Sequence, residues 1–81
     1  MKVQAFYFGA LRARLGLAEQ WLELAPGSRA EDAAKAACGH LGPEWPACLT
    51  MAVNEEMMPP GTPLKDGDTL ALLPPVSGGV H

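Results

Sequence analysis

The order of hydrophobic and polar positions along the chain predicts five short strands and one well-formed helix. In residues 1–8 hydrophobic side chains fall on both parities, so a strand there has two largely apolar faces and belongs in the centre of a sheet. Residues 69–73 have the same pattern and predict a second central strand. The other expected elements are strands at 21–24, 48–53 and 56–58 and a short helical turn at 10–15.

The helix is predicted over residues 28–41 because both of its ends carry recognisable signals. Ser28 and Glu31 have the spacing of a capping box, in which each side chain bonds the backbone N–H of the other residue. Gly42-Pro43 stops the helix, and Trp45-Pro46 is expected in a loop. Its apolar face consists mostly of small side chains, which favour close packing on a sheet. They are Ala33, Ala34, Ala37, Cys38 and Leu41.

These elements predict an α+β fold, a mixed sheet of about five strands with one main helix packed on one face. If the first and last strands are adjacent and central, the arrangement is a ubiquitin-like β-grasp. We expect residues 1–73 to form this domain and residues 74–81 to form an extended, flexible C-terminal tail.

The tail differs from the rest of the chain in composition. Pro74 and Pro75 hold their segment extended and cannot donate hydrogen bonds to a sheet. Gly78 and Gly79 have no Cβ atoms, so the backbone there fits into spaces that other residues could not enter. A glycine pair alone is compatible with a frayed terminus. Behind a stiff proline neck, it favours a carrier whose C-terminus is the working part.

Composition and charge argue against several classes of function. The net charge is −3, and the six Lys and Arg residues are scattered, which argues against nucleic-acid binding. No apolar run approaches the roughly 20 residues needed to cross a bilayer. No signal peptide is recognisable, so we expect a cytoplasmic protein in which Cys38 and Cys48 are reduced thiols.

The polar residues provide no complete catalytic or metal-binding set. The spacing of Cys38, His40, Cys48 and His81 does not fit a zinc site, and no metal is expected. The pair Asp66 and Asp68 is more typical of a solvated turn than of an acid–base pair. The chain is therefore not expected to form an active site of its own or to bind a cofactor.

One apolar surface is expected on the sheet. If the helix covers the face that carries Tyr7 and Leu72, then Phe6, Phe8 and Leu73 lie on the opposite face near the root of the tail. An exposed apolar patch usually marks a protein interface, although a loop folded over that face is an alternative.

Along nearly its whole length the chain resembles the small, sulfur-carrier subunit of molybdopterin synthase. The motifs that carry the resemblance are Phe8-Gly9-Ala10-Leu11-Arg12, Ala52-Val53-Asn54, Leu64-Lys65-Asp66-Gly67-Asp68 and Pro74-Pro75-Val76-Ser77-Gly78-Gly79. The last is the most specific, because Asp-Gly-Asp turns recur across β-grasp sulfur carriers.

The resemblance implies that the chain is the sulfur-donating subunit of a sulfurtransferase complex. An activating enzyme of the ubiquitin-E1 type would use ATP to adenylate the Gly79 carboxylate, and sulfur transfer would give a thiocarboxylate. The tail, with Gly78, would then enter the large subunit of a heterotetrameric synthase. Its sulfur would help to build the dithiolene of molybdopterin from cyclic pyranopterin monophosphate, for the molybdenum cofactor. The resemblance implies that Phe8, Met57 and Leu73 contact the large subunit, and we expect the same of Phe6, Pro74, Pro75 and Val76.

The chain departs from the family pattern at its end. In most members the second glycine is the C-terminus, whereas here Val80 and His81 follow it. We expect a processing protease to remove them, since an exposed glycine-rich end is easily reached. The alternative is that this copy is inactive in sulfur transfer as encoded. The alternatives are a sulfur carrier for thiamine (its thiazole) or for tRNA thiolation, and a ubiquitin-like protein modifier.

Overall fold

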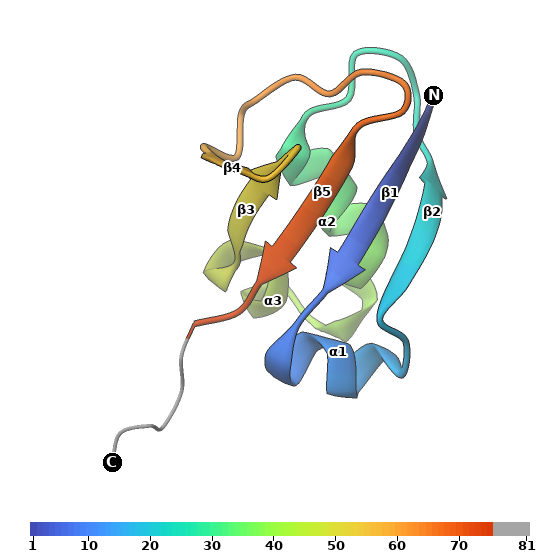
Figure 1. The fold of residues 1–81 in the computed structure, drawn as a ribbon. Helices are drawn as coiled ribbons and strands as arrows, with labels where there is room; N and C mark the ends of the chain where they lie inside the picture. Colours follow the sequence, from blue (N-terminus) through green and yellow to red (C-terminus); the bar gives the residue numbers. More distant parts are fainter. Residues whose placement is uncertain (76–81) are drawn as a thin grey trace.

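The fold is a mixed sheet of five strands with its main helix behind it (Figure 1). The structure is a computed structural model and describes residues 1–75. The strands follow the order β2–β1–β5–β3–β4 across the sheet. In chain order the elements are β1 (Lys2–Tyr7), α1 (Gly9–Leu15), β2 (Glu19–Glu23), α2 (Ala30–Cys38), the 3₁₀ helix η1 (Gly39–Leu41), α3 (Glu44–Cys48), β3 (Thr50–Val53), β4 (Glu56–Met58) and β5 (Thr69–Leu73).

The first and last strands are central and adjacent, as predicted. β1 and β5 run parallel. Their pairing begins with Gln4 opposite Thr69 and ends with Tyr7 opposite Leu72. β2 pairs with β1, and β3 pairs with both β5 and β4, in each case antiparallel. The α+β fold and the ubiquitin-like β-grasp arrangement are therefore confirmed. Because β5 ends beside α1, the neck of the tail leaves the domain at that end of the sheet (Figure 1).

The core lies between α2 and the sheet. Tyr7 and Leu72 are buried on the helix-facing side, where Val3, Ala5 and Leu70 join them. The helix contributes small buried residues, which let its axis approach the strands closely. They are Ala30, Ala33, Ala34, Ala37 and Cys38. The prediction of which helix residues are buried is confirmed, except that Leu41 belongs to η1 and is only half-buried.

The predicted capping box between Ser28 and Glu31 is wrong by one residue. The Ser28 hydroxyl donates to the Ala25 carbonyl at 2.7 Å, as part of the preceding turn. The helix begins at Ala30, and the Asp32 carboxylate accepts the N–H of Arg29 at 2.8 Å. Ser28 does not cap the helix, because the N-cap position is Arg29 and the Glu31 N–H donates to the Pro60 carbonyl at 2.8 Å.

Two strand boundaries and one loop also differ from the sequence-based expectation. Trp45-Pro46 lies in the short helix α3, so the third strand begins at Thr50 and Cys48 is helical. Proline is tolerated in the first turn of a helix, because the N–H it lacks has no partner there. The Arg14 guanidinium lies 5.7 Å from the centre of the Trp45 ring and links α1 to α3. The second strand begins at Glu19, two residues before its expected start.

Candidate functional site

A row of apolar side chains crosses the sheet on the face opposite α2. Phe6 pairs with Ala71, Ala71 pairs with Ala52, and Ala52 pairs with Met57. Paired residues project on the same side of a sheet. On β1, β5 and β3 the neighbours along each strand lie in the core, and on β4 Met58 is half-buried against it. The row therefore runs from β1 to β4 on the face that the helix does not cover.

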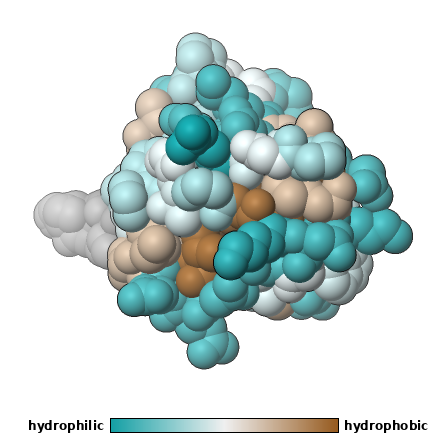
Figure 2. Space-filling view, turned by 90° about the horizontal axis from the view of Figure 1, so that it is seen from above, coloured by the Kyte–Doolittle hydropathy of each residue, from teal (hydrophilic) through white to brown (hydrophobic). Residues whose placement is uncertain are grey.

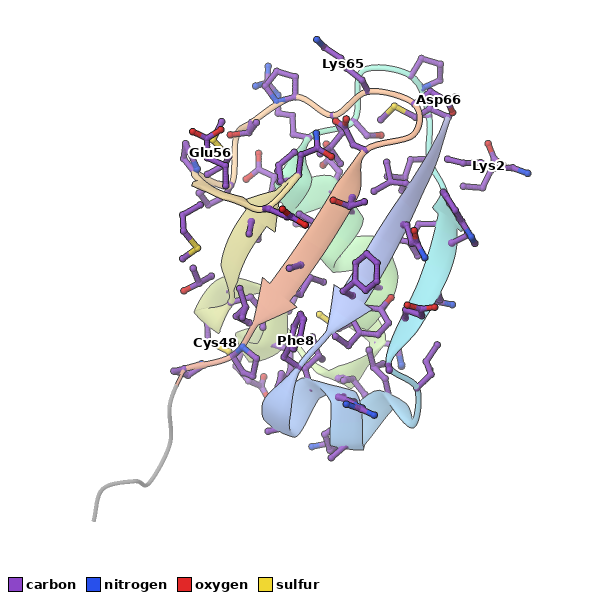
Figure 3. The ribbon with its side chains drawn as sticks, viewed as in Figure 1. Lys2, Phe8, Cys48, Glu56, Lys65 and Asp66 are labelled. Atoms are coloured by element: carbon purple, nitrogen blue, oxygen red, sulfur yellow. The ribbon has the colours of Figure 1, made fainter. Side chains whose placement is uncertain are left out.

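Phe8 and Leu73 extend this row to the end of the sheet where β5 finishes. Phe8 is 43% exposed and Met57 is 63% exposed, while Phe6 and Leu73 are half-buried. Figure 3 shows Phe8 at the foot of β1, beside the end of β5. We call these four residues, with Ala52 and Ala71, the apolar face. The expected placement of Phe6, Phe8 and Leu73 opposite Tyr7 and Leu72 is confirmed, and their role in binding remains a prediction.

The root of the tail packs against the start of α1. A Cβ atom on Gly9 would lie 3.2 Å from Pro74 Cγ, and the φ of Gly9 is +56°. Both facts favour glycine here, because other residues rarely adopt this φ and a methyl group would press on the proline ring. Gly9 thus allows Pro74 to lie directly on the helix start.

A cleft of about 400 Å³ lies beside this contact. Its walls come from α1, α3 and the neck: Ala10, Glu44, Trp45, Cys48, Pro74 and Pro75. Pro74 is half-buried and Pro75 is exposed. Val76, Gly78 and Gly79, which the sequence analysis assigns to the working tail, lie outside the described residues, as do Val80 and His81.

The two carboxylates of the Asp66–Asp68 turn bond backbone N–H groups and do not form an acid–base pair. Asp66 accepts from the Lys2 N–H at 2.7 Å, and Asp68 accepts from the Lys65 N–H at 2.8 Å. The Asn54 side chain also donates to Asp68, at 3.0 Å. Figure 3 places Asp66 and Lys65 at the end of the molecule away from Phe8 and Cys48. The surface at that end is mainly hydrophilic (Figure 2).

The cysteines differ in their surroundings. Cys38 is buried, its thiol donates to the Ala34 carbonyl at 3.2 Å, and burial raises its pKa, which disfavours the reactive thiolate. Cys48 is exposed at the cleft. In the part of the chain that the structure describes, no group of three His, Cys, Asp or Glu side chains could hold a metal ion.

The contacts at the tail root and the exposed Trp21 on β2 were not identified from the sequence. The contact between Gly9 and Pro74 joins residues far apart in the chain, and a single glycine after a strand gives no sign of it.

Among residues 1–75, no helix has the length and apolar character to span a membrane.

Comparison with known proteins decides the family. The sequence profile of the ThiS family matches residues 5–79. The chain belongs to the ThiS family. A relative in Chlamydomonas reinhardtii, the molybdopterin synthase sulfur carrier subunit, is 37% identical over 98% of this chain and 100% of its own length. The family resemblance inferred from the sequence motifs is therefore confirmed.

Two solved structures extend the comparison. SAMP1 from Haloferax volcanii has a TM-score of 0.83 at 25% identity, over 98% of this chain and 100% of its own. A chain of the complex of subunits 1 and 2 of the molybdopterin-converting factor from Helicobacter pylori resembles the present chain less closely than SAMP1 does. Its TM-score is 0.63 at 27% identity, over 98% of this chain and 100% of its own. Both carry the same fold as this member of the ThiS family.

Proposed function

We propose that this member of the ThiS family is the sulfur carrier of a molybdopterin synthase. The observation that carries the proposal is the 37% identity to a molybdopterin synthase sulfur carrier subunit, over 98% of this chain and the full length of the relative. The profile match ends at Gly79, the residue to which the mechanism assigns the chemistry. We further propose that the protein works in the cytoplasm.

The chemistry begins at the Gly79 carboxylate. One carboxylate oxygen attacks the α-phosphorus of ATP in an activating enzyme, which forms an acyl-adenylate and releases pyrophosphate. A sulfur donor then displaces AMP, so that a C–S bond replaces the C–O bond to the adenylate. The thiocarboxylate delivers its sulfur to cyclic pyranopterin monophosphate in the large subunit. Glycine suits this role because its stem carries no side chain that would block a narrow active site.

This chemistry requires a free carboxylate at Gly79. With Val80 and His81 attached, the Gly79 carbonyl belongs to a peptide bond and cannot be adenylated. We therefore propose that a protease removes both residues before activation. The end of the family match at Gly79 supports this step.

The body of the protein, residues 1–73, serves as the docking module, and residues 74–81 serve as the tail. The apolar face lies on the uncovered side of the sheet and reaches the neck at Phe8 and Leu73, so a partner held there would also receive the tail. We propose that this partner is the large subunit, in a heterotetramer. The complex of subunits 1 and 2 of the molybdopterin-converting factor from Helicobacter pylori supports such an assembly.

A ubiquitin-like protein modifier is the second candidate. The similarity to SAMP1 favours it, because SAMP1 is named a small archaeal modifier protein and shares the fold at a TM-score of 0.83. A modifier would attach its C-terminal glycine to lysines of other proteins and would appear in cells as adducts of higher mass. A carrier for thiamine or tRNA thiolation would instead load sulfur and deliver it to another synthase.

Reconstitution with a large subunit tests the proposal. A chain that ends at Gly79, supplied with activating enzyme, ATP, a sulfur source and cyclic pyranopterin monophosphate, is expected to yield molybdopterin. The full chain should be inactive until it is trimmed. Gly79→Ala in the trimmed chain should abolish the product while its folded spectrum stays unchanged. Product formation by the untrimmed chain, or by the alanine variant at the normal rate, would refute the role of Gly79.

A further inference from the structure

β2 forms an outer edge of the sheet, and half of its backbone groups point away from the molecule. The Tyr7 N–H donates to the Ala18 carbonyl and the Leu24 N–H donates to the Met1 carbonyl, each at 2.8 Å. In an antiparallel pair the residues that bond the neighbouring strand alternate with residues that face outward. The outward set is therefore Glu19, Trp21 and Glu23. Within residues 1–75 no segment pairs with this edge (Figure 1).

The same three residues project their side chains on the uncovered face of the sheet. Their partners in β1 are Phe6, Gln4 and Lys2, none of which belongs to the core. Trp21 is 58% exposed at the middle of the strand. Natural proteins usually protect an edge strand with charges or prolines, and a large apolar side chain has the opposite effect. Exposed tryptophans are common anchors of protein interfaces.

The charges beside Trp21 define what could pair with it. Glu23 lies 3.3 Å from the N-terminal ammonium group, whereas Glu19 has no ion-pair partner among residues 1–75. A second copy of the chain, paired antiparallel about Trp21, would set Glu19 opposite Glu23 on both sides of the centre. Like charges directly opposite each other destabilise a strand pair. A strand with basic residues two positions before and after an apolar residue would meet opposite charges instead.

We propose that the outer edge of β2 docks an extended basic segment of a partner protein, which adds a sixth strand to the sheet. Backbone bonds to Glu19, Trp21 and Glu23 would hold the segment, and an apolar side chain would pack on Trp21. One Lys or Arg would face Glu19, and the other would share Glu23 with the N-terminal ammonium group. This surface is separated from β5 and the neck by the whole of β1. It is therefore a second interaction site, beyond the proposed delivery of sulfur.

A peptide titration followed by NMR on the full chain tests this proposal. The probe is the acetylated peptide Thr-Lys-Thr-Val-Thr-Lys-Thr, and its control carries Glu in place of both Lys. We expect saturable amide shifts confined to β2 and β1 with the basic peptide. The acidic peptide should bind roughly tenfold more weakly, since two cross-strand charge pairs change sign. Equal binding of the two peptides, no saturable binding, or shifts centred on the apolar face would overturn the proposal.

Variants separate the anchor from the charges. Trp21→Thr keeps a strand-forming residue but should remove binding of the basic peptide. Glu19→Lys should lower the affinity for the basic peptide and raise it for the acidic one. Glu56→Lys, on the opposite edge strand β4, is the matched control and should bind both peptides as the unmodified chain does. Loss of binding in the Glu56 variant, or normal binding in the Trp21 variant, would contradict the assignment to β2.

Discussion

Tyr7 shows at the scale of one residue how burial makes stability depend on pH. Burial, helped by the nearby Cys38, raises the pKa of Tyr7 from 10.0 to about 12. The unfolded chain therefore loses this proton first as the pH rises. The free energy of unfolding should therefore fall as the pH rises from 10 to 12. Below pH 10 this contribution is fully present.

Tyr7→Phe isolates the effect. The variant loses the hydrogen bond from the hydroxyl to the Gln20 side chain, 2.7 Å long, and should be roughly 1 kcal/mol less stable near pH 7. In denaturant titrations its stability should decline less steeply above pH 10 than that of the unmodified chain. The same decline in both proteins would show that other groups cause it.

At the same scale, sequence patterns identified which side chains are buried but not every local bond. The alternation in β1 correctly separated Tyr7 from Phe6 and Phe8, and the structure shows that the parity of Tyr7 is the buried one. The Ser28 cap was misplaced, since a hydroxyl at the right spacing was instead bonded to the Ala25 carbonyl. Whether the hydroxyl accepts from a helix N–H or donates to a nearby carbonyl depends on the path of the preceding turn, which spacing alone does not define.

At the scale of elements, the contact between α1 and the neck makes a specific prediction. Gly9→Ala would bring a methyl group to 3.2 Å from Pro74 Cγ, so the neck must shift. In the proposed function the neck directs the tail into the active site of the large subunit, so the rate of sulfur delivery should fall roughly 3- to 10-fold. Single-turnover transfer from the loaded carrier to the large subunit measures it.

Gly16→Ala is the control for Gly9→Ala. Gly16 has φ +78° and ends the same helix, but a Cβ there would meet nothing within 4 Å. Both variants should lose roughly 1–2 kcal/mol of stability from the left-handed backbone, and only Gly9→Ala should slow the transfer. If both variants transfer sulfur equally slowly, the loss of stability explains the effect. If neither variant transfers sulfur more slowly, the contact between Gly9 and Pro74 does not orient the tail.

The same scale shows where element prediction succeeded. The five strands and the main helix were predicted from the spacing of hydrophobic residues. This spacing is regular because the sheet and the helix each bury one apolar side in the same core. The short helix α3 was missed, since Trp45-Pro46 resembles a loop in sequence. Its formation depends on tertiary contacts, including Arg14 over the Trp45 ring, 5.7 Å from its centre.

At the scale of the whole molecule, the apolar face should hold the large subunit. Met57→Asp puts a charge on a side chain that is 63% exposed, so the fold should be nearly as stable as before. The affinity for the large subunit should fall roughly 10- to 100-fold, because a desolvated interface disfavours an unpaired charge. Calorimetry measures the affinity.

Ala36→Asp places the same charge on the exposed side of α2, away from the apolar face. It should bind the large subunit normally. A loss of affinity in both variants would indicate a general effect of negative charge, and normal affinity of Met57→Asp would exclude this face as the docking surface.

The functional site was predictable from the sequence in its parts but not in its assembly. Phe6, Phe8 and Leu73 were assigned to one surface by alternation, and Met57 came from the family resemblance. That Met57 completes a row with Ala52, Ala71 and Phe6 required the register of four strands, which no local pattern encodes. The β2 edge was missed because an exposed Trp21 does not differ in sequence from a buried one.

The intact mass of the protein, recorded before and after treatment with the activating enzyme, ATP and a sulfur source, tests the central claim most directly. We expect the mature chain to end at Gly79 and to gain the mass difference of one sulfur in place of one oxygen. Fragmentation should locate the change at Gly79, and the trimmed Gly79→Ala chain is the control. A chain that keeps Val80 and His81 in cells and never gains sulfur would contradict it.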